Sequence, residues 1–590
     1  MFIWLTRCLP GLSLLALASL LLFAFSDVLR LPPWNDIIPG PGGGSKNGTV
    51  KVLNIAQAVF VIYTVFIHVN MFVFTLRLAF SLFSMAKRTR RTITKHRSKV
   101  PVTASAKGRT ESETRGLALS GFQEQSDQLA TELTDDGHRS IENRDLIHAI
   151  ILPNYCEDLD TLRTTMTVLA SHPNAKWQYE IYLAMEQKEK NAAAKASRLI
   201  SEFEKRFLRI GATFHPSGLA GEIAGKSSNV AFAAQHVLGA HRTALHAEPC
   251  NIMVTVMDAD SHLSQYYFAE IQRLHSQHIG QADRSFYCCP IIFDRNSHDS
   301  PVLVRCADLL WGFAGLSTMY PGTWLALPTS VYSLPLALVD SVGGWDSDPT
   351  AIGEDLHMLL KCYFGTQGDI VTRVVPVPAS QCNVSSDKGR GWRRQVETLL
   401  ARYRQGLRHM WGALDTGFAT RQMALNLGRG RWRLFPRLRD ITIVHLLWEA
   451  HFLPSHLTVL MVFSVFYTLC VPAVEMHPAV IWAFSVTGLL RTLSFIGMNV
   501  NLSIYGYWHA MCLDMRMQDM RAANLTGTGC SRRVWYHPQY LIERICFPVA
   551  GTVFGALPTL HAVFAHFWTD RLVYRVSQKP SFSLEASAIV

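Results

Sequence analysis

The chain has little charge for its length. Of its 590 residues only 17% are charged, whereas 49% are hydrophobic. This balance is too apolar for an ordinary cytosolic enzyme and too charged for a chain that consists only of membrane helices. Because the length also exceeds what one compact core holds, we expect a soluble domain combined with membrane segments.

The sequence also lacks a cysteine framework and internal repeats. Twelve cysteines occur without regular spacing, and none of them forms a zinc-type pattern. We interpret Cys288 and Cys289, which lie in an apolar run, as reduced and buried thiols of a cytosolic domain. The net charge of +11 does not indicate nucleic-acid binding, because no recognition helix accompanies it. Basic residues crowd beside apolar runs, over 87–91 and 429–439, which is typical of the cytoplasmic side of a membrane.

Apolar runs over 4–26 and 53–84 are long enough to cross a bilayer, which takes about 20 residues. The first could be a cleaved signal peptide, but we favour an uncleaved anchor because the run is long and no clean small-residue cleavage site follows it. The loop between the two runs contains the sequon Asn47-Gly48-Thr49, which predicts a glycoprotein with this loop on the luminal or outer side. Further spans are predicted near 456–473, 479–505 and 545–567.

Short apolar runs alternate with helical patterns from about residue 141. Strands are predicted over 146–152, 179–185, 252–257 and 286–293. Such alternation favours an α/β domain with a largely parallel sheet, in which ligands bind beyond the carboxyl ends of the strands. The predicted order is two N-terminal transmembrane helices with a short luminal loop (1–91), a flexible linker (92–140), a cytosolic domain (141–415), interfacial helices (416–455), C-terminal transmembrane helices (456–570) and a tail (571–590).

The strongest candidate site is the sequence from Val254 to Asp260, in which an apolar strand ends in Asp258-Ala259-Asp260. Alternate residues of an extended chain point the same way, so both carboxylates can converge on one Mg²⁺ or Mn²⁺ ion together with substrate phosphates. An Asp-x-Asp alone is a weak signal, since most are turns or helix caps.

Four further segments add polar groups. Lys226 follows Gly225 at the start of a helix, where it can reach a phosphate. The segment Gly343-Gly344-Trp345-Asp346 allows a tight loop and offers the flat face of Trp345 to a sugar. Glu354-Asp355 precedes an amphipathic helix, where Asp355 suits a helix cap or a general base. Gln405 and Arg408 share one face of a predicted helix over 391–411, near Trp411, and a guanidinium suits a departing diphosphate.

Together these elements resemble glycosyltransferase family 2, in particular its membrane-integrated branch of cellulose, chitin and hyaluronan synthases. The resemblance covers about 146–415. It implies a GT-A-like nucleotide-sugar-binding α/β domain inserted between transmembrane helices. It further implies that Asp258 and Asp260 bind the metal, that Asp355 is the general base, and that Glu186, Lys226, Gln405 and Arg408 lie at the nucleotide sugar. Trp345, Glu354 and Trp411 are expected at the acceptor.

Two positions depart from the family pattern. Glu186 stands where relatives carry an aspartate, and His409 stands where relatives carry the tryptophan that accompanies processive synthesis. The implied reaction is an inverting transfer from a nucleotide sugar, by family default UDP-linked, to an acceptor hydroxyl. Synthesis and export of a polysaccharide is one expected outcome, and a single addition to a lipid or a protein is the alternative. The expected partners are a nucleotide sugar, a glycan or lipid acceptor and membrane lipids, without nucleic acid, at the plasma membrane or the Golgi.

Two other functions fit parts of the sequence. Ala220 to Ser227 nearly matches a phosphate-binding loop of nucleotide hydrolases, but the preceding 213–218 segment is a poor strand. A nucleotide-regulated transporter is suggested by Arg491, which lies inside a predicted span, because ionisable residues in membranes are usually functional. Neither alternative uses Glu354, Asp355, Gln405 and Arg408 together.

Overall fold

The computed structural model describes residues 1–26, 53–97, 146–223, 225–242, 251–430, 437–525 and 537–572. The sequon loop, most of the predicted linker and the tail lie outside these ranges.

A seven-stranded mixed sheet forms the centre of the α/β domain, in the order β3-β2-β1-β4-β7-β5-β8. Its strands are β1 (Ile147–Asn154), β2 (Tyr179–Glu186), β3 (Arg209–His215), β4 (Ile252–Val256), β5 (Ser285–Cys288), β7 (Tyr332–Pro335) and β8 (Val371–Val374). All pairs are parallel except those made by β7, which runs antiparallel to β4 and β5. The largely parallel sheet expected from the sequence is thereby confirmed. Strand order reverses between β1 and β4, and in such sheets the crevice at this point binds ligands.

Two strands differ from the prediction. The run 286–293 is not one strand, because β5 ends at Cys288 and β6 (Ile291–Phe293) pairs with β9 (Ala379–Gln381) in a second sheet. Pro290, which has no N–H to donate, separates the two. The segment 213–218, predicted to be a poor strand, contains the last three residues of β3, which pairs with β2 in parallel over its whole length. Only Thr213 and His215 of β3 are buried at this edge of the sheet, so the strand has no continuous apolar run.

Helices cover both faces of the sheet. One face packs on α5 (Leu159–Ala170), α7 (Ala192–Phe203) and α10 (Gln265–Gln277), and the other on α8 (Lys226–Ala240), α12 (Leu336–Ser341) and α13 (Glu354–Gly365). Because the strands are buried on both sides, β1 and β4 consist of almost continuous apolar residues. Short elements complete this part: α6 (Ala175–Gln178), η2 (Ile279–Arg284) and η3 (Pro349–Ala351).

Among the described residues, four helices are long and apolar enough to cross a membrane: Ile55–Lys95 in α3, Leu453–Cys470 (α17), Pro478–Ala522 (α18) and Tyr540–Ala565. These helices support a membrane protein. The last consists of α19 (Pro538–Gly551), the π-helical η5 (Thr552–Ala556) and α20 (Leu557–Ala565). The first predicted span, 4–26, is instead divided into α1 (Phe2–Arg7) and the shorter apolar helix α2 (Leu9–Ala24). Between α17 and α18 lies the short turn η4 (Ala473–Glu475).

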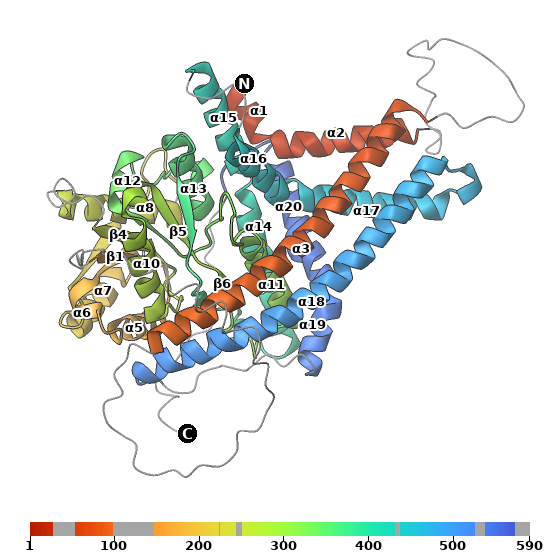
Figure 1. The fold of residues 1–590 in the computed structure, drawn as a ribbon. Helices are drawn as coiled ribbons and strands as arrows, with labels where there is room; N and C mark the ends of the chain where they lie inside the picture. The colour runs from red at the N-terminus through yellow and green to blue at the C-terminus, as the bar shows by residue number, and fades with distance from the viewer. Residues whose placement is uncertain are drawn as a thin grey trace, which may run out of the picture.

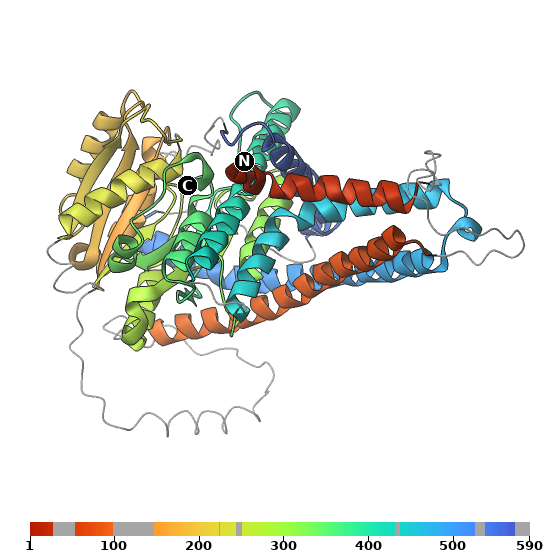
Figure 2. The same ribbon diagram turned by 90° about the horizontal axis from the view of Figure 1, so that it is seen from above.

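The helices α3 (Ile55–Arg97) and α18 run side by side from the apolar end of the molecule to the sheet (Figures 1 and 2). Trp508 of α18 donates a hydrogen bond to Thr89 of α3 at 3.0 Å. At the end of α18, Arg516 contacts Asp294 at 3.0 Å and Asp519 contacts His262 at 3.4 Å. The helix is therefore much longer than the predicted span 479–505, because its last turns pack on the α/β domain.

Four more helices lie between the sheet and the long apolar helices: α11 (Val302–Leu316), α14 (Trp392–Trp411), α15 (Leu414–Gly428) and α16 (Leu438–His451). The helices predicted over 391–411 and 438–450 correspond to α14 and α16. At Gly406 of α14 an added Cβ would lie 2.8 Å from the carbonyl oxygen of Phe554 in η5. Glycine is required here because the backbones of α14 and η5 touch, and this contact fixes α14 against the membrane helices.

Candidate active site

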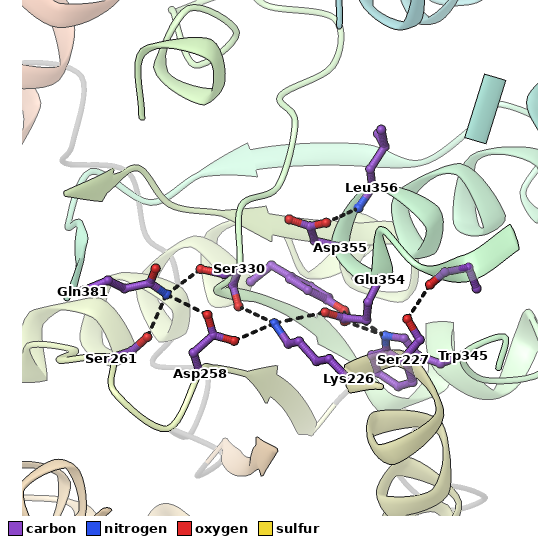
Figure 3. Close-up of polar contacts among 12 residues, drawn as sticks. Lys226, Ser227, Asp258, Ser261, Ser330, Trp345, Glu354, Asp355, Leu356 and Gln381 are labelled. Atoms are coloured by element: carbon purple, nitrogen blue, oxygen red, sulfur yellow. Dashed lines mark hydrogen bonds and ion pairs between the residues drawn. The ribbon is translucent and has the colours of Figure 1, made fainter. Parts of the chain in front are cut away.

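Asp258 and Asp260 follow β4 directly, at the carboxyl edge of the sheet. Asp258 is partly exposed, whereas Asp260 is 4% exposed. The Nε2 atom of Gln381 donates to Asp258 Oδ2 at 3.0 Å (Figure 3). The backbone N–H of Cys382 donates to Asp260 Oδ2 at 3.3 Å. The short second sheet thus holds both carboxylates from one side.

Lys226 begins α8 and reaches across the site. Its Nζ lies 2.8 Å from Asp258 Oδ1 and 3.1 Å from Glu354 Oε2, as Figure 3 shows. Burial opposes a charge on Lys226, but the carboxylates of Asp258 and Glu354 outweigh it and raise the pKa of Lys226 above its ordinary value. Lys226 therefore stays protonated, and it connects the pair Asp258 and Asp260 with the pair Glu354 and Asp355.

Glu354 and Asp355 form the first turn of α13. The Asp355 carboxylate accepts a hydrogen bond from the N–H of Leu356 at 2.9 Å (Figure 3), and Asp355 lines the same cavity as Lys226. Burial, together with the charge of Glu354, raises the pKa of Asp355 to about 6. A carboxylate with such a pKa is an effective proton acceptor near neutral pH.

Glu354 is held from behind by an aromatic pair. It accepts hydrogen bonds from the Tyr332 hydroxyl and, at 3.2 Å, from Nε1 of Trp345, which also donates to the Tyr332 oxygen at 2.7 Å. Gly343 and Gly344 have φ values of 77° and 73°, which confirms the glycine turn predicted before Trp345. The ring of Trp345 is 7% exposed and supports Glu354, so the structure does not place it where a sugar could stack.

Gln405, Arg408 and His409 lie on α14. His409 stacks on Trp311 of α11 with ring centroids 4.2 Å apart. Trp411 is 3% exposed, donates to the carbonyl of Asp570 at 3.0 Å and packs on His566. The indole beside His409 is therefore that of Trp311, and Trp411 is part of the packing against the C-terminal helices.

The predicted site residues come together in one cavity of about 830 Å³. Its wall includes Glu186, Lys226, Asp258, Asp260, Glu354, Asp355, Gln405 and Arg408. Trp345 and Trp411, both predicted at the acceptor, are not among the residues that line it. Glu186 is buried at the end of β2, where His215 Nδ1 lies 3.4 Å from its carboxylate. The structure establishes this proximity, while the chemical role of each residue remains a prediction.

Two residues of the site were not predicted. Glu157, just after β1, lines the cavity. Burial and the charges of Asp260 and Asp258 raise its pKa to about 7. β1 and β4 are parallel neighbours, so the loop after β1 lies beside Asp258. An acidic residue directly after the predicted strand 146–152 was therefore the sequence feature that could have identified Glu157. No local sequence feature identifies Gln381 as a site residue, since its position depends on the pairing of β6 with β9.

The residues present fit a divalent cation only together with a substrate. Among the described residues no group of three or more His, Cys, Asp or Glu side chains is arranged to hold a metal. Asp258 and Asp260 offer carboxylate oxygens, which Mg²⁺ and Mn²⁺ prefer, and such ions commonly complete their coordination with substrate phosphates and water. The donor set is therefore compatible with an ion that enters with a nucleotide diphosphate.

A family model described as "Glycosyl transferase family group 2" matches residues 253–486. The match begins in β4, includes both acidic pairs and Arg408, and ends in α18. It supports a glycosyltransferase family 2 domain. No curated protein matches the chain. The glycosyltransferase domain has the mixed α/β core of a GT-A fold, as predicted, and the family implies a nucleotide-sugar donor and an acceptor.

The topology also bears on the phosphate-binding-loop alternative. In nucleotide hydrolases that loop and the metal-binding strand cooperate at one phosphate, but here β2 and β1 separate β3 from β4. Lys226 instead contacts Asp258 and Glu354. This arrangement favours the glycosyltransferase interpretation.

Proposed function

We propose that the protein is an inverting, metal-assisted glycosyltransferase that moves a sugar from a UDP-linked donor to an acceptor hydroxyl on the cytosolic side of a membrane. The observation that carries the proposal is the single cavity that contains Asp258, Asp260, Lys226, Asp355 and Arg408. The family match supports the class of reaction. The donor base, the metal and the cytosolic position rest on the sequence arguments.

The residues have distinct roles in this mechanism. Asp258 and Asp260 would hold Mg²⁺ or Mn²⁺, whose charge offsets that of the diphosphate. Asp355 accepts the proton of the acceptor hydroxyl as its oxygen attacks the anomeric carbon. The bond from that carbon to the diphosphate oxygen breaks on the opposite side, so the configuration inverts. Lys226 and Arg408 stabilise the charge that develops on the departing nucleotide.

A panel of nucleotide sugars with Mn²⁺, followed by sizing of the products, tests the proposal. We expect one UDP-sugar to be turned over, and we expect Asp258→Asn and Asp355→Asn to lose transfer while both variants stay folded. Long products would establish polysaccharide synthesis, and single additions would establish the alternative. Normal transfer by either variant would contradict the mechanism.

A further inference from the structure

The cavity does not end at the catalytic residues but continues between the apolar helices. Beyond Asp355 its wall is formed by one face of α17, including Leu457 and Met461, and by one face of α18. The α18 face comprises Arg491, Ser494, Phe495, Met498, Asn499 and Leu502, a spacing of three or four residues that places them in one stripe. Figures 1 and 2 show α17 and α18 separating toward the catalytic domain, which leaves the space that these residues line.

A cluster of aromatic rings packs between the apolar helices on the side away from the catalytic residues. Phe25 packs on Phe60 and Tyr467 with centroids 5.0 and 4.6 Å apart, and Phe484 packs on Tyr467 at 6.0 Å. None of these rings lines the cavity, whose wall on α17 stops at Met461 and on α18 at Arg491. The wall on these two helices therefore ends before the aromatic cluster, and it includes many apolar side chains, which suits part of a lipid better than a hydrated polymer in transit.

Two arginines in this part of the wall have no acidic partner. Arg491 contacts His68 Nε2 at 3.2 Å, and Arg544 of α19 donates to the Asn499 carbonyl at 2.6 Å and the Ser503 hydroxyl at 2.9 Å. Within the described part of the chain, no carboxylate lies within 4.0 Å of either guanidinium. The nearby Glu449 is already paired with Arg77.

The positions of the arginines indicate an anionic ligand. Arg491 is the fourteenth residue of α18, about 20 Å from its start along the axis, so it lies well inside the span. A cation at this depth is costly unless it has a partner. Asn499, which binds Arg544, is eight residues further on, which corresponds to about 12 Å. Both long side chains can lean toward an anion that enters between them.

We propose that the acceptor is a membrane lipid whose head group carries both a phosphate and a free hydroxyl. Its phosphate lies between Arg491 and Arg544, its hydroxyl faces Asp355, and its apolar chains leave between α17 and α18 into the bilayer. This inference rests on the proposed glycosyltransferase function. It selects a lipid over a secreted polysaccharide, because much of the wall between α17 and α18 is apolar and because Arg491 and Arg544 have no acidic partner among the described residues.

The test uses the purified full-length protein and the radiolabelled nucleotide sugar that it turns over best. Total membrane lipids are separated into a neutral and an anionic fraction, and each is supplied in phosphatidylcholine vesicles. We expect label in the organic extract only with the anionic fraction. Release of free nucleotide is measured in parallel, because it counts all donor turnover, and its excess over the label found in lipid gives donor hydrolysis without an acceptor.

Variants separate the lipid site from the catalytic centre. In Arg491→Gln and Arg544→Gln the ratio of lipid transfer to donor hydrolysis is expected to fall about tenfold, the effect of losing one charged hydrogen bond. Met498→Trp, which fills the cavity, should act likewise. The matched control is Val500→Trp on the same helix, since Val500 is 51% exposed and does not line the cavity.

Each remaining outcome contradicts the inference. Label in the neutral lipids, in a water-soluble polymer or in protein would identify another acceptor, with the glycosyltransferase function intact. Donor hydrolysis without transfer to either lipid fraction would exclude a lipid acceptor. Absence of any nucleotide-sugar turnover would instead remove the proposed function, and this inference with it.

Discussion

Replacing Asp355 by Asn is expected to abolish transfer and to stabilise the fold. The pKa of this carboxyl is raised from 3.8 to about 6 by burial and by the charge of Glu354. At a pH well above 6 the ionised form therefore costs the folded state about 3 kcal/mol, since one pKa step corresponds to about 1.4 kcal/mol. A neutral amide of nearly the same shape removes that cost, while loss of the base lowers the rate by roughly 10²–10⁴-fold.

The raised pKa of Asp355 also predicts how the stability gained in Asp355→Asn changes with pH. A carboxyl with a raised pKa opposes folding fully above about pH 6, less between pH 6 and 3.8, and not at all below 3.8. The stability advantage of Asp355→Asn should accordingly be largest at neutral pH and disappear on acidification. Thermal unfolding midpoints of the two proteins in the same detergent, recorded from pH 4.5 to 8, measure it.

Asp346 provides a control, because its pKa is shifted in the opposite direction from that of Asp355. His357 and Lys361 outweigh the effect of burial and lower the pKa of Asp346 to about 2, with His357 Nε2 at 3.1 Å. Its ionised form stabilises the fold above pH 3.8 and loses that contribution as the pH falls toward 2. Asp346→Asn should therefore lower the unfolding midpoint at neutral pH. If Asp355→Asn lowered it as well, or if its advantage did not depend on pH, the electrostatic argument would be wrong.

Three further results are expected. The donor-saturated rate of the wild-type protein should rise as the pH passes about 6, where Asp355 ionises, and a rate that is flat from pH 5 to 8 would argue against this base. Lys226→Met should lose most donor turnover and destabilise the protein by about 3–5 kcal/mol, because Glu354 is left buried without its cation. Turnover kinetics and unfolding midpoints check this, and values equal to those of the wild-type protein would contradict it. Gly406→Ala should reduce stability, because the added Cβ would lie 2.8 Å from a backbone carbonyl oxygen of η5. Gly428→Ala, which has open space around the added Cβ, should be neutral or stabilising by about 1 kcal/mol. Equal unfolding midpoints for the two variants would show that α14 and η5 are not in contact.

The sequence was most informative where chemistry follows a local pattern. The apolar run before Asp258 and Asp260 predicts both the strand and the edge at which it ends, because a strand buried on both faces needs continuous apolar residues. Glu354 and Asp355 are recognisable for a similar reason, since acidic residues favour the first turn of a helix. These features depend on neighbours within a few residues, and a single sequence contains them.

Features that depend on distant pairing could not be predicted in the same way. Gln381 reaches Asp258 only because β9 pairs with β6, and neither short strand has a distinctive pattern. Trp345 was assigned to the acceptor because its flat ring could stack on a sugar, and Trp411 was assigned to it through the family resemblance. Their orientation is set by Glu354 and by the C-terminal helices. Side-chain direction in loops and at helix ends follows from tertiary packing, which the local pattern does not encode.

The charge balance of the cavity gives an independent reason to expect the divalent cation. Its wall contains the carboxyl groups of Glu157, Asp258, Asp260, Glu354 and Asp355. The raised pKa of Glu157, to about 7, follows from burial and from this crowding of negative charge. A nucleotide diphosphate would add further negative charge to such a site, and Lys226 is already engaged by Asp258 and Glu354. A divalent ion that arrives with the diphosphate would add positive charge to that of Arg408, at a point where Asp258 and Asp260 could share it.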